Sequence, residues 1–127
     1  MEWGIVLKNY LLLLKGLQIT LYVSFISIAI GTVISTIFGL SYVAGNRPVR
    51  FFISTYVFIM RGLPFLLVVF GIFFMLPFCG INFSAITSGI IALTLYFMAT
   101  GTEIVRGSIQ AVSKDQQDAA YALGMSY

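Results

Sequence analysis

Residues 16–46 read GLQITLYVSFISIAIGTVISTIFGLSYVAGN, and this stretch contains no Asp, Glu, Lys or Arg. A helix that crosses the hydrocarbon core of a bilayer needs about 20 consecutive apolar residues, so the stretch is long enough for one crossing. It ends in the turn Gly45-Asn46-Arg47-Pro48, which contains two strong helix breakers. The sequence therefore predicts a first membrane span at residues 19–44.

The composition of the whole chain supports the same conclusion. Of its 127 residues, 60% are hydrophobic and 9% are charged, whereas soluble globular proteins average about 45–50% apolar and about 25% charged residues. So little polar surface cannot coat a water-soluble particle, and disordered chains are poor in the apolar residues that dominate here. We therefore expect an integral membrane protein of the all-α class, a polytopic bundle of membrane helices.

The residue types exclude several kinds of site. With no His and a single cysteine, Cys79, the chain offers no histidine-based metal site, no catalytic His dyad and no internal disulfide. Seven Lys and Arg against four Asp and Glu give a net charge of +3. Because the cations are scattered, they indicate membrane topology rather than nucleic-acid binding. We expect no metal, no cofactor and no nucleic-acid partner.

A second charge-free stretch, residues 62–102, is long enough for more than one crossing. It is interrupted at residues 77–84, where Pro, Gly, Asn and Ser predict a short turn. A third span is therefore expected at residues 85–104. The second span has to begin upstream, at residues 52–77, and contains Arg61-Gly62-Leu63-Pro64. Since proline removes a backbone hydrogen bond and clashes with the preceding turn, a kinked or broken helix is expected there.

The N-terminal stretch and the loop charges bear on how the chain lies in the membrane. Residues 1–16 combine Trp3 and a leucine run with Lys8 and Lys15, which suits a helix lying among the lipid headgroups. A simple upstream extension of the first span explains them equally well. Lys and Arg near span ends mark the cytoplasmic side. Two of them, Lys8 and Lys15, precede the first span. Four lie beyond the first and third spans, namely Arg47, Arg50, Arg106 and Lys114. This excess predicts that the N-terminus lies outside and that the C-terminus is cytoplasmic.

Small residues recur at a strict four-residue spacing in the first span, at Ser27, Gly31, Ser35 and Gly39. On a helix they form a ridge that lets another backbone approach closely. The alternative is that membrane helices are simply rich in small residues. Either way, the first span is expected to pack on protein.

Polar side chains near the later spans are candidates for a substrate pathway, namely Arg61, Tyr96 and Thr100. Charged residues at membrane depth usually face a bundle interior, a cavity or the interface. For Arg61 a structural role at the helix break is favoured over substrate contact. The hydroxyls of the third span can line a polar path or bond within their own helix. Glu103 and Arg106 are three residues apart and are expected to pair on one helix face.

A short helix is predicted beyond the third span, at residues 114–124. Ser113 and Gln116 have the spacing of a capping box, and acidic residues near the start suit the helix dipole. Gly124 is a plausible C-terminal cap. Such a helix can be an ordinary connector, or it can dock in a groove on a partner. Its candidate docking residues are Lys114, Asp115, Asp118, Ala119, Ala120, Leu123 and Gly124.

Several sequence blocks occur in an order typical of one family. Residues 103–112 read EIVRGSIQAV, followed by Gln116, Asp118-Ala119-Ala120 and Leu123-Gly124. Together with three upstream blocks they resemble the ABC-importer permeases, most closely the polar amino-acid subfamily, whose coupling loop reads Glu-Ala-Ala, three residues, Gly, and later Ile-x-Leu-Pro. The upstream blocks are Gly16-Leu17-x-x-Thr20-Leu21, Asn46-Arg47-Pro48-x-Arg50 and Arg61-Gly62-x-Pro64.

The resemblance implies a permease without catalytic chemistry of its own. Two permease subunits, identical or different, would form the pathway, and a cytoplasmic ATPase dimer would hydrolyse ATP after docking on the coupling helix, residues 114–124. An extracytoplasmic binding protein would deliver a polar amino acid or a cystine-like solute. The chain has no Gly-rich phosphate loop with a following Lys, which agrees with a partner handling ATP.

The sequence departs from the family pattern at three places. Asp118 replaces the usual Glu and keeps the carboxylate, and Ser113 stands where Pro is common. The Ile-x-Leu-Pro half and the remaining membrane helices are absent, so the chain is expected to be the front part of a larger permease. The alternatives are a small self-standing membrane protein, such as a pore-forming protein or assembly factor, and an ABC permease for another solute.

Overall fold

The computed structural model describes residues 9–125, and within them every regular element is helical. The all-α prediction is therefore confirmed for this part of the chain. The elements follow one another as α2 (Tyr10–Ala44), α3 (Arg47–Gly62), α4 (Phe65–Phe70), the π-helical turn η1 (Gly71–Met75), the 3-10 turn η2 (Leu76–Cys79), α5 (Ala85–Gln110) and α6 (Lys114–Ala122).

The first long helix begins earlier than predicted. α2 starts at Tyr10 rather than at residue 19 and runs without interruption to Ala44. Its 35 residues give a length of about 52 Å at 1.5 Å per residue, more than the roughly 30 Å of the hydrocarbon core. Residues 10–16 thus belong to the same helix as the first predicted span, and a separate helix is wrong for them because nothing there breaks α2. Residues 1–8 lie outside the described part.

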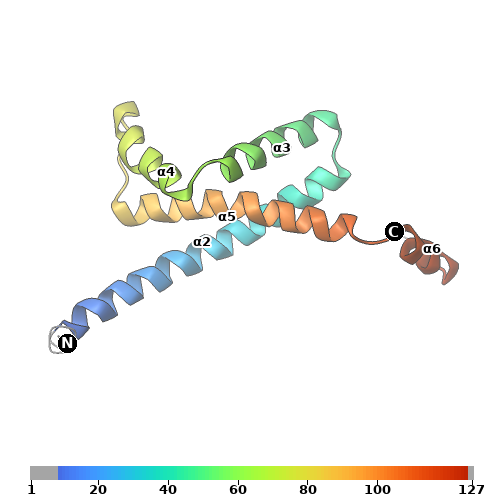
Figure 1. Ribbon diagram of the computed structural model, residues 1–127, viewed down its shortest axis with the longest axis horizontal. Helices are drawn as coiled ribbons and strands as arrows, with labels where there is room; N and C mark the ends of the chain where they lie inside the picture. Colours follow the sequence, from blue (N-terminus) through green and yellow to red (C-terminus); the bar gives the residue numbers. More distant parts are fainter. Residues whose placement is uncertain (1–8, 126–127) are drawn as a thin grey trace.

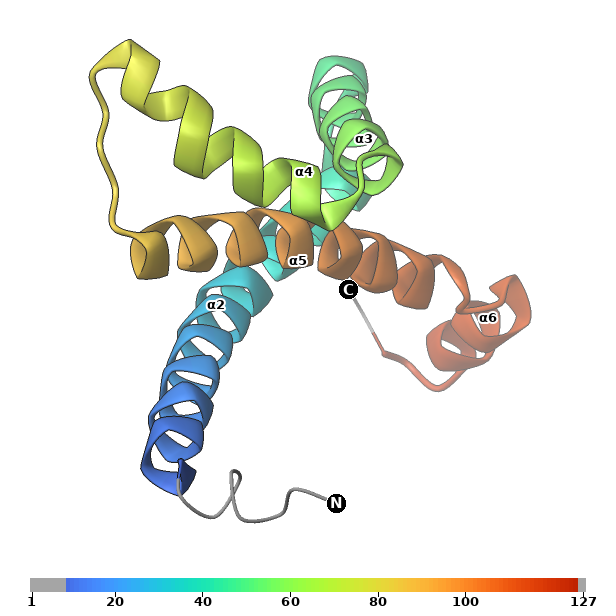
Figure 2. The same ribbon diagram turned by 60° about the vertical axis from the view of Figure 1, so that its left-hand side comes forward.

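The centre of the fold is the crossing of α2 and α5, which is visible in both ribbon views (Figures 1 and 2). Ser27, Gly31, Ser35 and Gly39 are the buried residues of α2. A Cβ added at Gly31 would lie 2.7 Å from Phe97 Cδ1, and one at Gly39 would lie 2.5 Å from Val105 Cγ1. The small-residue ridge therefore lies against α5, and the small size of its side chains sets how closely the two backbones approach.

A tight corner joins α2 to α3. Asn46 has an extended backbone, α3 begins at Arg47, and Pro48 occupies the first turn, where its missing N–H costs no helical hydrogen bond. Arg50 reaches back from α3 and donates from Nε to the carbonyl oxygen of Tyr42, at 3.1 Å, and from Nη2 to that of Val43, at 2.9 Å. These are carbonyl groups that the end of α2 leaves without helical partners.

The second predicted span is broken where the sequence indicated. Leu63 is extended, Pro64 precedes α4, and the segments Arg47–Gly62 and Phe65–Cys79 are bent by 104° (Figure 2). Beyond Phe70 the chain continues as the π-helical and 3-10 turns, not as an α-helix to residue 77. Among the described residues α2 and α5 are each long and apolar enough to span a membrane, and the bent pair is either a broken span or a re-entrant loop.

The third predicted span begins where expected. Gly80 has φ +80° and ends the 3-10 turn, a conformation that glycine adopts without a Cβ penalty. Ser84 then caps α5 by accepting from the Thr87 N–H. α5 continues to Gln110 rather than stopping at residue 104, because residues 105–110 contain no proline.

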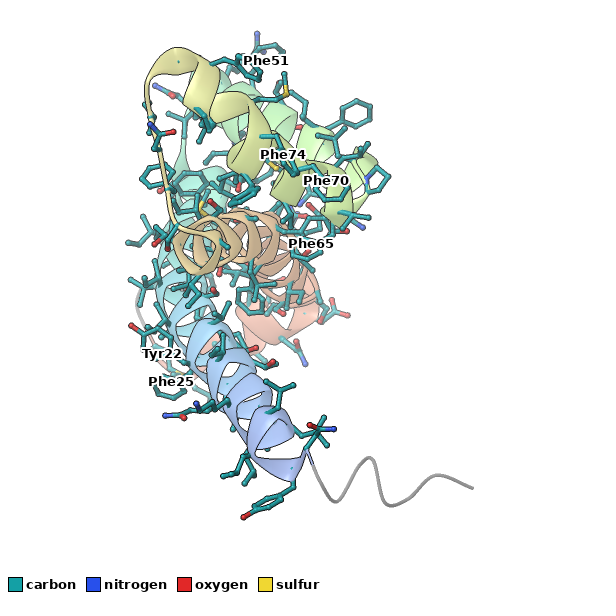
Figure 3. The ribbon with its side chains drawn as sticks, turned by 90° about the vertical axis from the view of Figure 1, so that its left-hand side faces the viewer. Tyr22, Phe25, Phe51, Phe65, Phe70 and Phe74 are labelled. Carbon is teal, nitrogen blue, oxygen red and sulfur yellow. The ribbon has the colours of Figure 1, made fainter. Side chains whose placement is uncertain are left out.

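Large apolar side chains cover much of the outer surface. Figure 3 labels six exposed aromatic residues on α2, α3, α4 and η1, and many aliphatic side chains are exposed as well. Soluble monomers rarely expose so much contiguous apolar surface, whereas lipid acyl chains cover it without cost. The labelled residues are Tyr22, Phe25, Phe51, Phe65, Phe70 and Phe74.

Candidate functional site

A polar hollow of about 170 Å³ opens between α3 and α5 beside the end of α2. Arg61, in the last turn of α3, lines it together with Glu103 and Arg106 of α5. The other lining residues are Tyr42, Ile53, Ser54, Val57, Phe58 and Thr102. Three of the chain's few charged side chains thus gather around one small space.

Glu103 and Arg106 form the ion pair that their spacing predicted. Arg106 Nη2 donates to Glu103 Oε1 at 2.6 Å. The Arg106 guanidinium also stands over the ring of Tyr42, 4.8 Å from its centroid, which is a cation–π distance. Both side chains of the pair are about 30% exposed, so the pair itself contributes little stability, of order 0.5 kcal/mol. Its larger effect is to fix where the Glu103 carboxylate lies.

The structure separates the three substrate-pathway candidates. Tyr96 is half-buried and packs its ring edge-on against Phe65, with 5.4 Å between centroids. The exposed Thr100 donates its hydroxyl to the Tyr96 carbonyl oxygen at 3.3 Å. Neither residue lines the hollow that contains Arg61. The hydroxyls of Thr100 and Thr102 bond within their own helix, the local alternative that the sequence left open.

Arg61 lies where the second span breaks, as its position in the sequence indicated. It is exposed, and it is the basic residue of the last turn of α3. A cation there interacts favourably with the partial negative charge of the helix C-terminus. Arg61 therefore fits the structural interpretation and also faces the hollow.

α6 has well-formed caps at both ends. The Ser113 side chain accepts from the Gln116 N–H at 3.3 Å, and Gln116 Oε1 accepts from the Ser113 N–H at 3.4 Å, which completes the capping box. At the other end Gly124 has φ +78°, its N–H donates to Tyr121, and the Met125 N–H donates to Ala120. This is a Schellman motif, so the helix is Lys114–Ala122 and Gly124 lies just beyond it.

The side chains of α6 are available for contact. The helix extends away from the other helices in both ribbon views (Figures 1 and 2), and Leu123 and Tyr121 are 83% and 52% exposed. Ala120 is half-buried, and the remaining candidate docking residues are exposed: Lys114, Asp115, Asp118, Ala119 and Gly124.

The sequence analysis did not predict the contacts of two residues that shape this region. Tyr42 brings the end of α2 to Arg106, and Arg50 fastens the corner between α2 and α3. A signal existed for Arg50, because a cation four residues beyond a Gly-Asn turn can reach the carbonyl end of the preceding helix. Nothing in the sequence indicated the partner of Tyr42, which depends on the crossing of two helices more than forty residues apart.

The sequence profile of the binding-protein-dependent transport system inner membrane components matches residues 31–127. This match covers most of the chain, from the small-residue ridge of α2 to α6. The chain belongs to that family. The resemblance recognised from the sequence blocks is therefore confirmed.

Individual relatives agree with the family match. The chain is 36% identical over 121 residues to the probable amino-acid ABC transporter permease protein YckA of Bacillus subtilis, covering 95% of this chain and 54% of the relative. It is 32% identical over 126 residues to the L-cystine transport system permease protein TcyB of the same organism, covering 98% of this chain and 54% of the relative. The chain spans about half the length of these two relatives.

A solved structure shares the fold. It is described as the crystal structure of an amino acid ABC transporter with histidines, and it superimposes with a TM-score of 0.91 at 31% sequence identity. The superposition covers 100% of this chain and 59% of that chain. The crossing of α2 and α5, the broken α3–α4 pair and the separate α6 thus belong to a fold that this chain shares with a chain of that transporter.

Proposed function

We propose that this chain forms part of the permease subunit of an ATP-driven ABC importer that moves a polar amino acid across the cell membrane. The chain would do no catalysis itself, and ATP would be hydrolysed by a partner ATPase dimer. The family match, the named relatives and the amino acid ABC transporter of the same fold support this proposal.

The observation that carries the proposal is α6, a helix capped at both ends and held clear of the others. Its own caps stabilise it, and it exposes small and apolar side chains, including Ala119 and Leu123. We take residues 114–124 to be the coupling helix that docks in a groove on the ATPase. Because α6 follows α5 after a short link, a displacement of the ATPase would be passed to α5.

The proposed mechanism is alternating access. ATP binding to the ATPase dimer favours one conformation of the membrane helices, and hydrolysis restores the other. A second permease subunit, identical or different, would complete the pathway, and an extracytoplasmic solute-binding protein would deliver the cargo. Polar amino acids are the expected cargo, and the names of YckA and TcyB include amino acid and L-cystine, respectively.

The topology in the proposal follows the charges. α2 and α5 each cross the membrane, and the bent α3–α4 pair makes the third crossing. Arg47, Arg50, Arg106 and Lys114 then lie on the cytoplasmic side with α6, and the N-terminus lies outside.

The decisive experiment co-expresses the chain with the ATPase subunit of an amino-acid ABC transporter and purifies the complex through a tag on the ATPase. Ala120→Asp places a charge on the half-buried face of α6, so the variant is expected to insert in the membrane but to lose the ATPase. Gln110→Asp, at the exposed end of α5, is the matched control and should keep it. Equal recovery of both variants would contradict the coupling-helix assignment.

A further inference from the structure

A second hollow, apart from the polar one, lies between the α4–η1 segment and the first turn of α5. Both ribbon views show this segment diverging from α5 before the chain returns to the start of that helix (Figures 1 and 2). The hollow has a volume of about 250 Å³. Its lining is mostly apolar and includes three phenylalanine rings, and we call it the aromatic hollow: Val69, Phe70, Phe73, Phe74, Ala85 and Ser88.

The three rings form the wall of the aromatic hollow on the side of α4 and η1. Phe73 packs edge-on against Phe74, with 4.9 Å between ring centroids, and Phe70 lies 5.7 Å from Phe74. The rings are between 36% and 56% exposed, so a ligand can reach the wall from outside the protein. Phe73 and Phe74 belong to the π-helical turn η1, a distortion that often occurs at functional sites.

Ser88 is the polar residue among those that line the aromatic hollow. It is 1% exposed, and its hydroxyl oxygen has no hydrogen-bond partner within residues 9–125. An unpaired buried hydroxyl is unfavourable, because it has lost its bonds to water and gained none. A water molecule would not remedy this, since it needs about two to four polar partners and the lining offers one side chain. An apolar ligand with one hydrogen-bond acceptor would.

The depth of Ser88 in the bilayer narrows the class of ligand. Ser88 comes three residues after Ala85, where α5 begins, so it lies about 4.5 Å along the helix from its start. The interfacial layer on each side of the hydrocarbon core is about 5–8 Å thick. Ser88 thus lies near the level at which a diacyl phospholipid changes from headgroup to acyl chains, where its ester carbonyl groups are found. This holds whichever side of the membrane the preceding turn faces.

We propose that the aromatic hollow binds one acyl chain of an ester-linked phospholipid, with the Ser88 hydroxyl donating to the ester carbonyl oxygen. Rotation about the Cα–Cβ bond of Ser88, between staggered rotamers, would direct the hydroxyl to the ligand. The phenylalanine wall would pack on the methylene groups beside the carbonyl, and their burial is favourable. A free fatty acid fits less well, because its carboxylate would meet no cation among the lining residues. The inference goes beyond the proposed function and does not depend on the cargo.

The test compares two phosphatidylcholines of equal chain length that differ only in the linkage of their chains, ester or ether. The ether lipid lacks the carbonyl oxygen that Ser88 would bind. The chain is reconstituted in an equal mixture of the two, and native mass spectrometry identifies the lipid that is retained last as the collision energy rises. The diester should be retained about fivefold more often than the diether, which is the ratio that one neutral hydrogen bond gives.

Ser88→Ala should bring this ratio to about one. The variant should fold, because it removes a hydroxyl that has no partner in the described part of the chain. Ser108→Ala, at an exposed position of the same helix outside the aromatic hollow, is the matched control and should keep the fivefold ratio. A ratio of one in the unmodified chain, or an unchanged ratio in Ser88→Ala, would overturn the site.

Phe73→Ala tests the wall separately from the hydrogen bond. Loss of this ring should weaken retention of both lipids severalfold, since an acyl chain of either lipid packs on it. Phe25→Ala, which removes an exposed ring from α2 outside the aromatic hollow, should leave retention unchanged. Dimers of the chain that carry no lipid, and that become monomers in Phe73→Ala, would show that a second copy fills the hollow and would overturn the proposal.

Discussion

Arg50 Nη2 lies 2.9 Å from the carbonyl oxygen of Val43 and closes the corner between α2 and α3 from the far side of the turn. The same guanidinium binds the Tyr42 carbonyl through Nε. One side chain therefore satisfies two carbonyl groups at the end of α2 and fixes the direction in which α3 leaves. Because Tyr42 also supports Arg106, this corner is linked to the polar hollow.

We expect Arg50→Gln to loosen this corner without unfolding the chain. The shorter amide of Gln replaces an exposed guanidinium, and both hydrogen bonds from the charged donor are lost. This loss should destabilise the corner by about 1–3 kcal/mol. Hydrogen–deuterium exchange of the amides in residues 44–50 should accelerate several-fold, while exchange in the middle of α5 stays the same. Arg47→Gln is the control, and equal exchange in the two variants would show that Arg50 does not hold the corner.

The crossing of α2 and α5 should tolerate no side chain at Gly39. A Cβ there would lie 2.5 Å from Val105 Cγ1 and 3.3 Å from the Thr102 carbonyl oxygen, so Gly39→Ala has to push the helices apart. Overpacking of this kind costs about 1–3 kcal/mol. Gly89→Ala, with nothing within 4 Å, is the control and should be neutral or stabilising by up to about 1 kcal/mol. Thermal unfolding in detergent should separate the two, and a Gly39→Ala melting temperature equal to that of Gly89→Ala would contradict the packing.

The break between α3 and α4 should depend on Pro64. Proline lacks the N–H that would continue α3 and restricts the residue before it, and Leu63 is accordingly extended. In Pro64→Ala we expect the two segments to join into a straighter helix. Spin labels at the exposed positions Phe52 and Met75 should then move apart, towards the about 35 Å of a continuous helix.

Pro48→Ala lies in the first turn of α3 and is the control for the same measurement, because removing a proline there leaves the break in place. The label distance should be unchanged in that variant. A distance that stays short in Pro64→Ala would mean that the 104° bend is held by packing on α5, for example by the contact of Phe65 with Tyr96, rather than by the proline.

The sequence predicted those features whose causes are local. The cap at Ser113 depends on bonds within three residues, the break at Pro64 on a missing N–H, and the Glu103–Arg106 pair on one helical turn. The sequence also identified the small-residue ridge, because its spacing is a property of one helix. Which helix would lie on that ridge was not predictable, since this depends on contacts between residues far apart in the chain.

The differences between helices and predicted spans have the same physical origin. α2 and α5 extend beyond residues 19–44 and 85–104, because hydrophobicity indicates which residues cross the lipid and not where the helix ends. Polarity alone made Arg61, Tyr96 and Thr100 candidates for a substrate pathway, and that role stays a prediction. Glu103 and Arg106 line the same hollow as Arg61. This follows from the angle at which α3 crosses α5, which no local pattern contains.

The last prediction concerns α6, which extends away from the other helices (Figures 1 and 2) and depends on its own caps to stay folded. Ser113→Ala removes the acceptor of the Gln116 N–H and the reciprocal geometry of the capping box, at a cost of about 1 kcal/mol. A nine-residue helix is marginal in water even with good propensities, so this loss should unfold a substantial fraction of α6. Hydrogen–deuterium exchange of residues 117–122 should accelerate about fivefold, since 1 kcal/mol corresponds to that factor. Ser108→Ala, which removes an exposed hydroxyl bonded within α5, is the matched control.

If α6 is the coupling helix, Ser113→Ala should also weaken recovery with the ATPase by a similar factor. Faster exchange with unchanged recovery would mean that the ATPase binds elsewhere.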